Sequence, residues 1–192
     1  MIYLVRHGQT QLGAEGRFQG CKEDYPLNEL GKQQARRLGN ALPFLPICSS
    51  PLKRARMTAD LSTYGANVIV FESLRDVDVG SLGGKTPEEA SKLFPKFYRQ
   101  WINHEAYVLP DGESPEHILE RVKLALGQLP RDAVVVSHEG IIRFMLCELL
   151  GLSGSFFPKF RIEEASISVV EDGQLIRLND TSHLRGFPVC PY

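Results

Sequence analysis

Two histidines in this sequence have neighbours that suit them to chemistry at phosphorus. Arg6 and His7 directly follow a short apolar run, and His138 follows another apolar run and precedes Glu139. A neutral imidazole is a good nucleophile near pH 7, and a guanidinium holds phosphoryl oxygens in a fork that an ammonium group cannot match. A charged imidazole can also stabilise the negative charge of a phosphoryl group during its transfer. Taken singly, each histidine is more often a hydrogen-bonded core residue.

Arg54 is a third candidate because of where its helix is predicted to begin. Pro51 suits the first turn of a helix that continues to about Thr63, and Arg54 lies near that start. Helix N-termini attract anions through their free N–H groups and the helix dipole. Arg54 can therefore complete a phosphate site, whereas Lys53 and Arg56 suit a solvated basic face.

Predicted strands alternate with predicted helices along most of the chain. Short apolar runs predict strands at 2–5, 47–49, 67–71 and 133–136. Capping residues, prolines and helical spacing predict helices from Asn28 to Pro43, from Pro51 to about Thr63, from Ser114 to about Leu129 and over 140–150. Asp172-Gly173 marks a hairpin between 166–170 and 175–178. The alternation predicts an α/β fold, a three-layer α/β/α sandwich with a mostly parallel central sheet.

The candidate residues fall at one edge of this predicted sheet. Arg6-His7, Ser49-Ser50 and Ser137-His138 each follow directly after a predicted strand. In open α/β sheets, ligands bind beyond the carboxyl ends of the strands. We therefore expect both histidines and the neighbouring arginines to meet at that edge, although they are far apart in the sequence.

Residues 81–111 interrupt the alternation and predict a small helical excursion that covers the site. Phe94, Phe97 and Trp101 recur there at helical spacing, which favours packing in a small core over contact with the leaving group of a substrate. The excursion also has a basic bias, which favours a solvated helix face over recognition of a polyanionic substrate. The basic residues are Lys85, Lys92, Lys96 and Arg99.

Composition limits the classes of protein to consider. The chain has 192 residues, 43% of them hydrophobic, and a formal net charge of −1. This length predicts a single domain over residues 1–192. The near-neutral charge argues against a nucleic-acid partner. No apolar run reaches the roughly 18 residues of a membrane span, so we expect no membrane partner either.

The cysteines and histidines give no sign of a disulfide scaffold or a metal site. Cys21, Cys48, Cys147 and Cys190 are scattered without a CxxC pair, which favours reduced thiols in a cytoplasmic protein. None of the five histidines shows the short ligand spacings of a zinc site. The N-terminal apolar run lacks the basic flank of a signal peptide. We expect a cytoplasmic protein without a bound metal.

Several motifs, in order along the chain, carry a resemblance to a known family. They are Arg6-His7-Gly8-Gln9-Thr10, Gly16-Arg17-Phe18-Gln19-Gly20, Asp24 through Ala35, Ser49 through Ala59, Gly112-Glu113-Ser114, Val135-Val136-Ser137-His138 and Leu178 through Leu184. The Arg-His-Gly tripeptide alone is a weak signal, but the ordered set is specific and extends nearly to the C-terminus. The sequence resembles the histidine phosphatase superfamily, in the branch similar to cofactor-dependent phosphoglycerate mutase.

The resemblance implies a two-step phosphoryl transfer that needs neither a metal ion nor another cofactor. His7 forms a phosphohistidine, which water then hydrolyses. Arg6, Arg54 and His138 bind the phosphoryl oxygens, and their positive charge takes the place of metal ions. The expected catalytic residues are His7, Asp76, His138, Arg6 and Arg54, and the expected substrate-binding residues are Arg6, Thr10, Arg54, His138 and Glu139.

Two residues depart from the pattern of the family. Asp76 stands where the family usually has the glutamate that acts as general acid and then as base, and aspartate is one methylene shorter. Proton transfer needs a reach of about 3 Å, so the loop must lie closer or the step is slower. Gly13 stands where the family often has an asparagine that helps to hold phosphate, so Thr10 and backbone N–H groups are expected to supply part of that hydrogen bonding. Asp78 is a second candidate for the acid.

Two further residues match family motifs outside the catalytic set. Glu113 is expected either to orient a group of the active site or to cap the helix that follows it. His183 is expected to fix the C-terminal segment. Neither is assigned a role in proton transfer ahead of Asp76.

The leading expectation is a phosphatase that acts on a small phosphorylated metabolite. The excursion is short compared with the segments that cover the site in the dedicated glycolytic mutases of the family, which exposes a phosphohistidine to water and favours hydrolysis over mutase-type transfer. The departures at Asp76 and Gly13 also allow a phosphate-binding or regulatory protein with little turnover, and a metal-dependent hydrolase is a third alternative. The C-terminal hairpin offers a sheet edge for a homodimer or is capped within the monomer, and the sequence leaves both open.

Overall fold

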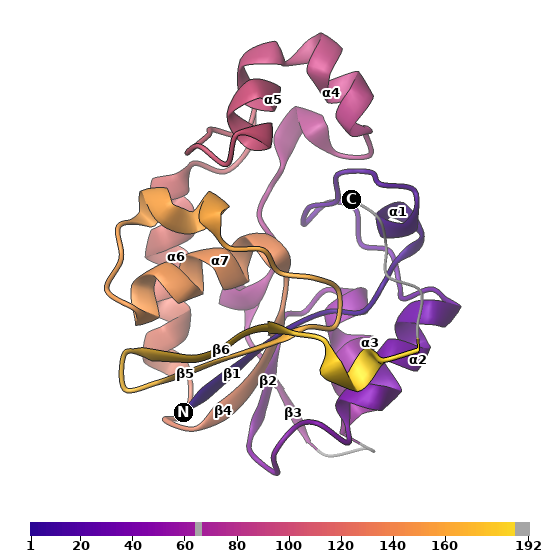
Figure 1. The fold of residues 1–192 in the computed structure, drawn as a ribbon, viewed down its shortest axis with the longest axis vertical. Coiled ribbons are helices and arrows are strands. Elements are labelled where there is room, and N and C mark those ends of the chain that lie inside the picture. Colours follow the sequence, from indigo (N-terminus) through magenta and orange to yellow (C-terminus); the bar gives the residue numbers. More distant parts are fainter. Residues whose placement is uncertain (64–66, 187–192) are drawn as a thin grey trace.

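Six short strands form one sheet at the centre of the molecule (Figure 1). The computed structural model describes residues 1–63 and 67–186. The strands, in the spatial order β3-β2-β4-β1-β5-β6, are β1 (Ile2–Arg6), β2 (Ile47–Ser49), β3 (Val68–Val70), β4 (Ala133–Ser137), β5 (Ile167–Glu171) and β6 (Gln174–Asp180). The first four in this order run parallel, and β5 and β6 pair antiparallel. The predicted α/β class and mostly parallel sheet are confirmed.

Helices cover both faces of the sheet, as Figure 1 shows. The long helices of the body are α2 (Glu29–Leu38), α3 (Lys53–Ser62), α6 (Pro115–Gln128) and α7 (Glu139–Leu149). Leu4 and Val135 belong to the core that includes residues of α6 and α7, whereas Val5 and Val134 belong to the core that includes residues of α2 and α3. Successive side chains of a strand point to opposite faces, so strands covered on both sides are apolar throughout. This arrangement is the three-layer sandwich expected from the sequence.

The helix that begins after Asn28 is shorter than predicted. Its start is confirmed, because the Asn28 side chain accepts a hydrogen bond from the Gly31 amide at 2.8 Å. The helix ends at Leu38, however, and the prediction that it continues to Pro43 was wrong. Gly39 and Asn40 favour helix poorly, and Leu42 still packs against the core from outside the helix. A single hydrogen-bonded turn continues beyond the helix, because the Leu42 amide donates to the Leu38 carbonyl at 3.1 Å, and this turn brings Leu42 to the core.

The excursion forms a small helical cap beyond the carboxyl ends of the parallel strands (Figure 1). Its elements are η2 (Gly80–Leu82), α4 (Pro87–Leu93) and α5 (Pro95–Ile102), and the turn η1 (Glu72–Leu74) precedes it. Phe97 is buried, and its ring centroid lies 6.5 Å from that of Trp101 and 5.9 Å from that of Phe18. The predicted aromatic core is confirmed, and Phe18 connects it to the N-terminal loop of the body.

The remaining short elements are α1 (Gln11–Ala14), η3 (Gly154–Lys159) and η4 (Ser182–Leu184). Helix α1 was not predicted, and Thr10 caps it by accepting a hydrogen bond from the Gly13 amide. His183 lies in η4, which contacts α2. Cys21, Cys48 and Cys147 are free thiols, and Cys190 lies outside the described residues. No helix in the described part of the chain is long and apolar enough to cross a membrane.

Two glycines allow the loop after β1 to lie directly against the first turn of α2. A Cβ atom at Gly8 would lie 2.6 Å from the Gly31 carbonyl oxygen, and one at Gly31 would lie 2.1 Å from the Gln9 carbonyl oxygen. The obstructing atoms belong to the backbone, so a side chain at either position requires the loop or the helix to move. This contact fixes the loop that carries His7.

We expect Gly31→Ala to lower the free energy of unfolding by about 1–3 kcal/mol, the usual cost of overpacking. Gly127→Ala is the matched control, because a Cβ atom there has no neighbour within 4 Å and alanine favours helix over glycine. Urea unfolding of both variants measures the difference. Equal effects of the two substitutions would contradict the proposed close contact.

Candidate active site

The two histidines lie side by side at the carboxyl ends of adjacent strands. β1 and β4 pair in parallel with Arg6 opposite Ser137, so His7 and His138 follow at the same edge of the sheet. The His7 amide donates to the Ser137 carbonyl at 3.0 Å. The imidazole centroids are 5.1 Å apart. The predicted meeting of these residues is confirmed.

Arg54 connects three other parts of the site. Its side chain is fully buried near the start of α3. Its Nε donates to His7 Nε2 at 3.2 Å, and its Nη2 donates to Asp76 Oδ2 at 2.8 Å. The carbonyl oxygens of Gly20 and Glu23 accept further hydrogen bonds at 3.0 and 3.1 Å. A buried guanidinium needs acceptors for its N–H groups, and these contacts hold the surrounding loops around it.

The hydrogen bonds of His7 define its tautomer. Nδ1 lies 2.7 Å from the Gly8 carbonyl oxygen, which only accepts, so the ring hydrogen is on Nδ1. Nε2 then carries a lone pair, consistent with its acceptance of a hydrogen bond from Arg54. Burial, assisted by the charges of Arg54 and Arg6, holds the pKa of His7 well below its ordinary value. His7 is therefore a neutral imidazole whose nucleophilic nitrogen faces the cationic part of the site.

His138 and Asp76 form the opposite side of the cluster. His138 Nε2 lies 2.7 Å from Ser50 Oγ, and His138 Nδ1 lies 3.4 Å from Asp76 Oδ2. Burial is the main reason that the pKa of His138 is well below its ordinary value, and Arg54 and His7 lower it further. Burial also raises the pKa of Asp76, although Arg54 opposes the shift. Asp76 therefore keeps a proton to higher pH than an exposed aspartate.

Asp78, the second candidate for the acid, has other partners. Its carboxylate lies 2.9 Å from Lys22 Nζ and accepts a hydrogen bond from the Gly80 amide. The hydrogen bond with Lys22 lowers the pKa of Asp78 although burial opposes it. Asp76 alone of this pair contacts both Arg54 and His138.

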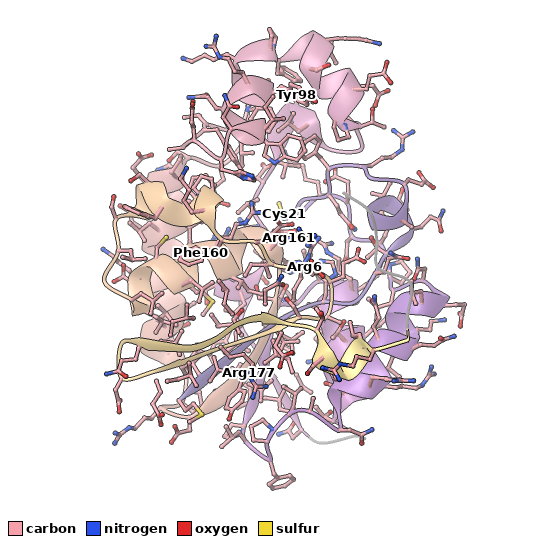
Figure 2. The ribbon with its side chains drawn as sticks, in the orientation of Figure 1. Arg6, Cys21, Tyr98, Phe160, Arg161 and Arg177 are labelled. Carbon is pink, nitrogen blue, oxygen red and sulfur yellow. The ribbon has the colours of Figure 1, made fainter. Side chains whose placement is uncertain are left out.

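Arg6 lies at the end of the sheet that faces the cap, as Figure 2 shows. Its Nη1 donates to the Ile162 carbonyl at 2.6 Å and lies 3.0 Å from Glu139 Oε2. Glu139 also pairs with Arg143. Burial raises the pKa of Glu139, but the charges of Arg143 and Arg6 outweigh it, and the pKa is lowered overall. The Glu139 carboxylate is therefore an anion that positions the Arg6 side chain. Direct contact of Glu139 with substrate stays a prediction.

Thr10 and Gly13 lie beside a carboxyl group that the sequence did not indicate. The Thr10 hydroxyl donates to Gln19 Oε1 at 2.8 Å and accepts from the Gly13 amide at 3.0 Å, so contact of Thr10 with phosphate also stays a prediction. Glu164 is buried, and its Oε1 would lie 2.6 Å from a Cβ atom at Gly13. Burial raises the pKa of Glu164 although Arg6 lowers it. Glu164 thus fills the space that a side chain at position 13 would occupy.

The sequence also missed Ser50 as a partner of His138 and the carbonyl acceptors of Arg54. Ser50 follows a predicted strand, and that position was the available signal. Glu164 lies in an irregular loop, so no spacing marks it. The cluster as a whole combines an imidazole lone pair, two arginines and a carboxyl group of raised pKa. Such a site can bind a phosphoryl group, accept it on nitrogen and protonate a leaving group.

Known proteins resemble this chain in sequence and in fold. Residues 2–177 match the family model of the histidine phosphatase superfamily, branch 1. Phosphoserine phosphatase 1 of Hydrogenobacter thermophilus is 34% identical over 203 residues, which cover 98% of this chain and 96% of that protein. A probable phosphoglycerate mutase GpmB of Salmonella arizonae is 34% identical over 88% of this chain and 84% of that protein. The crystal structure of a phosphoglycerate mutase from Thermus thermophilus is 36% identical, with a TM-score of 0.75 over 92% of this chain and 97% of that chain.

We expect both imidazoles to be neutral at pH 6.5, the ordinary histidine pKa, with the His7 hydrogen on Nδ1. Ring ¹⁵N chemical shifts measure this, because they separate the charged ring from each neutral tautomer. His7→Ala and His138→Ala assign the two sets of signals. A charged His7 ring at pH 6.5, or a neutral ring with its hydrogen on Nε2, would contradict the geometry described above.

Proposed function

This chain belongs to branch 1 of the histidine phosphatase superfamily, and we propose that it hydrolyses a small phosphate monoester through a phosphohistidine at His7. The observation that carries the proposal is the lone pair of His7 Nε2, held against the Arg54 guanidinium in a buried site. A neutral nucleophile beside fixed positive charge suits attack on an anionic phosphate ester.

In the first step, Nε2 of His7 attacks phosphorus and the bond from phosphorus to the ester oxygen breaks. The phosphoryl oxygens take over the N–H donors of Arg54 and Arg6, which disperse the developing charge. Asp76 transfers its proton to the departing oxygen, so that the leaving group becomes a neutral alcohol. The charge of the bound phosphate raises the pKa of Asp76 further and also favours the protonated form of His138.

In the second step, water attacks phosphorus and the bond from phosphorus to Nε2 breaks. The Asp76 carboxylate accepts a proton from the water, and inorganic phosphate leaves. Each group then has its starting protonation state, with a lone pair on His7 Nε2 and a proton on Asp76. The same carboxyl group thus acts as acid and then as base.

Some relatives are named phosphatases and others phosphoglycerate mutases, so experiment must decide between the two activities for this chain. The relative from Hydrogenobacter is named a phosphoserine phosphatase, and its match covers nearly all of both chains. We therefore propose phosphoserine as the first natural ester to test. Mutase activity would appear instead as transfer of the phosphoryl group between two positions of a phosphoglycerate. The predicted small phosphorylated substrate, cytoplasmic location and possible homodimer remain proposals.

We expect wild type to hydrolyse p-nitrophenyl phosphate in the presence of a metal chelator, because arginines supply the positive charge of the site. His7→Ala is expected to lower kcat/KM by about 10³-fold or more, the scale on which loss of a nucleophile acts. His117→Ala, at an exposed histidine in the first turn of α6, is the matched control. Comparable turnover by His7→Ala would overturn the nucleophile assignment. Vanadate binding without hydrolysis by wild type would instead favour a phosphate-binding protein.

Asp76→Asn is expected to slow the hydrolysis of esters with poor leaving groups more than that of esters with good ones. For phosphoserine we expect kcat/KM to fall about 10²-fold or more, and for p-nitrophenyl phosphate less than about 10-fold, because nitrophenolate needs little protonation. Burial raises the pKa of Asp76, so wild-type kcat/KM for phosphoserine should fall as pH rises through that pKa. Asp76→Asn should lack this descending limb. Equal losses on both esters would show that Asp76 is not the acid.

A further inference from the structure

Every carbonyl group of residues 73–78, which we call the acid segment because it carries Asp76, accepts a hydrogen bond. After the turn η1, residues 75–79 form neither helix nor strand. In a buried segment without helix or strand, the backbone N–H and C=O groups need hydrogen-bond partners from side chains or from other loops. The carbonyls of Ser73, Arg75 and Asp76 accept from the Arg121 side chain. The Leu74 carbonyl accepts from Ser137 Oγ. The Val77 and Asp78 carbonyls accept from the amides of Cys21 and Glu113. Three of these six carbonyls accept from the Arg121 side chain, and the hydrogen bond to Asp76 is the longest of the three at 3.5 Å.

Arg121 is itself held by a two-point ion pair. It lies on α6, and its Nε and Nη2 donate to the two carboxylate oxygens of Glu113 at 3.0 and 2.7 Å. Its Nη1 donates to the carbonyls of Ser73 and Arg75 at 3.0 and 2.7 Å. Both side chains of the pair are 14% exposed, so it differs from surface ion pairs, which contribute little. A forked guanidinium is suited to hold a carboxylate and a backbone turn together.

Glu113 is not the cap of the helix that follows it. Ser114 has that role, because its hydroxyl accepts a hydrogen bond from the His117 amide at 3.3 Å. Glu113 instead contacts the acid segment twice. Its amide donates to the Asp78 carbonyl at 2.8 Å, and its carboxylate accepts from the Asp78 amide at 3.4 Å. Of the two roles expected from the sequence, the contacts favour the orientation of a site residue.

We propose that Glu113 and Arg121 are positioning residues that set the distance between the Asp76 carboxyl and the reacting phosphoryl group. This inference rests on the proposed function, because it assigns the pair a role in the acid step of that reaction. Asp76 has a short side chain, so its reach depends on where its backbone lies. A general acid must come within about 3 Å of the oxygen that it protonates. A displacement of the segment therefore weakens the acid step, while Arg54 keeps its hydrogen bonds to His7 and to the carbonyls of Gly20 and Glu23.

The variants to compare are Arg121→Met, Arg121→Lys and Glu113→Gln. Methionine removes every hydrogen bond of the guanidinium, lysine keeps the charge but lacks the fork, and glutamine keeps the shape of Glu113 without its charge. Lys123→Met is the matched control, because Lys123 is an exposed cation on the same helix. If Arg121→Met does not fold, the two milder substitutions still test the proposal.

The first measurement is kcat/KM on phosphoserine and on p-nitrophenyl phosphate. For Arg121→Met we expect a loss of about 10-fold or more on phosphoserine and less than about 3-fold on p-nitrophenyl phosphate, with smaller losses of the same pattern for the milder variants. In an Asp76→Asn background the Arg121 substitution should cost almost nothing further, because both act through one group. Equal losses on the two esters, or losses that multiply with Asp76→Asn, would overturn the proposal.

The second measurement is hydrogen exchange of the amides of residues 73–78. We expect faster exchange in Arg121→Met than in wild type and no change in Lys123→Met. This arm needs no activity, so it separates the two proposals. A wild type that hydrolyses neither ester would refute the phosphatase function, and the exchange rates would still decide whether the pair holds the segment. Unchanged exchange in Arg121→Met would overturn the positioning role.

Discussion

The burial of Arg54 is the constraint on which the rest of the site depends. A guanidinium without access to water must find acceptors inside the protein, and here it finds them on His7, Asp76 and two loop carbonyls. These acceptors come from separate parts of the chain. The cation therefore determines how the loop after β1, the loop over residues 20–23 and the acid segment meet.

The reactive groups are themselves buried, and this shifts their pKa values. Burial disfavours charge on each of them, which lowers the pKa of both histidines and raises that of Asp76. One physical cause thus produces a neutral nucleophile and a carboxyl group able to hold a proton. A guanidinium is charged throughout the physiological pH range, so the pair of Arg54 and Asp76 has a net positive charge once Asp76 is protonated. A phosphate dianion would offset that charge.

Around this cluster, residues remote from the chemistry hold irregular loops in place. Gly8 and Gly31 bring the nucleophile loop against α2 by backbone contact, and Arg121 fixes the acid segment from α6. The rigid layers of the sandwich thereby determine positions within loops that have no regular structure of their own. Chains similar to this one carry both phosphatase and mutase names.

The sequence by itself determined the α/β layers and the edge where His7, Arg54 and His138 meet, because apolar runs predict parallel strands whose carboxyl ends must coincide. It did not determine the end of α2, where the helix stops at Leu38 and one further hydrogen-bonded turn brings Leu42 to the core. Only the tertiary structure placed Glu164 beside Gly13 and Arg121 beneath the acid segment. These contacts are between residues that are far apart in the chain, and one partner of each lies in an irregular loop. No periodicity or spacing in the sequence predicts them. They depend on how the helices and the sheet pack together and on which buried polar groups then need hydrogen-bond partners.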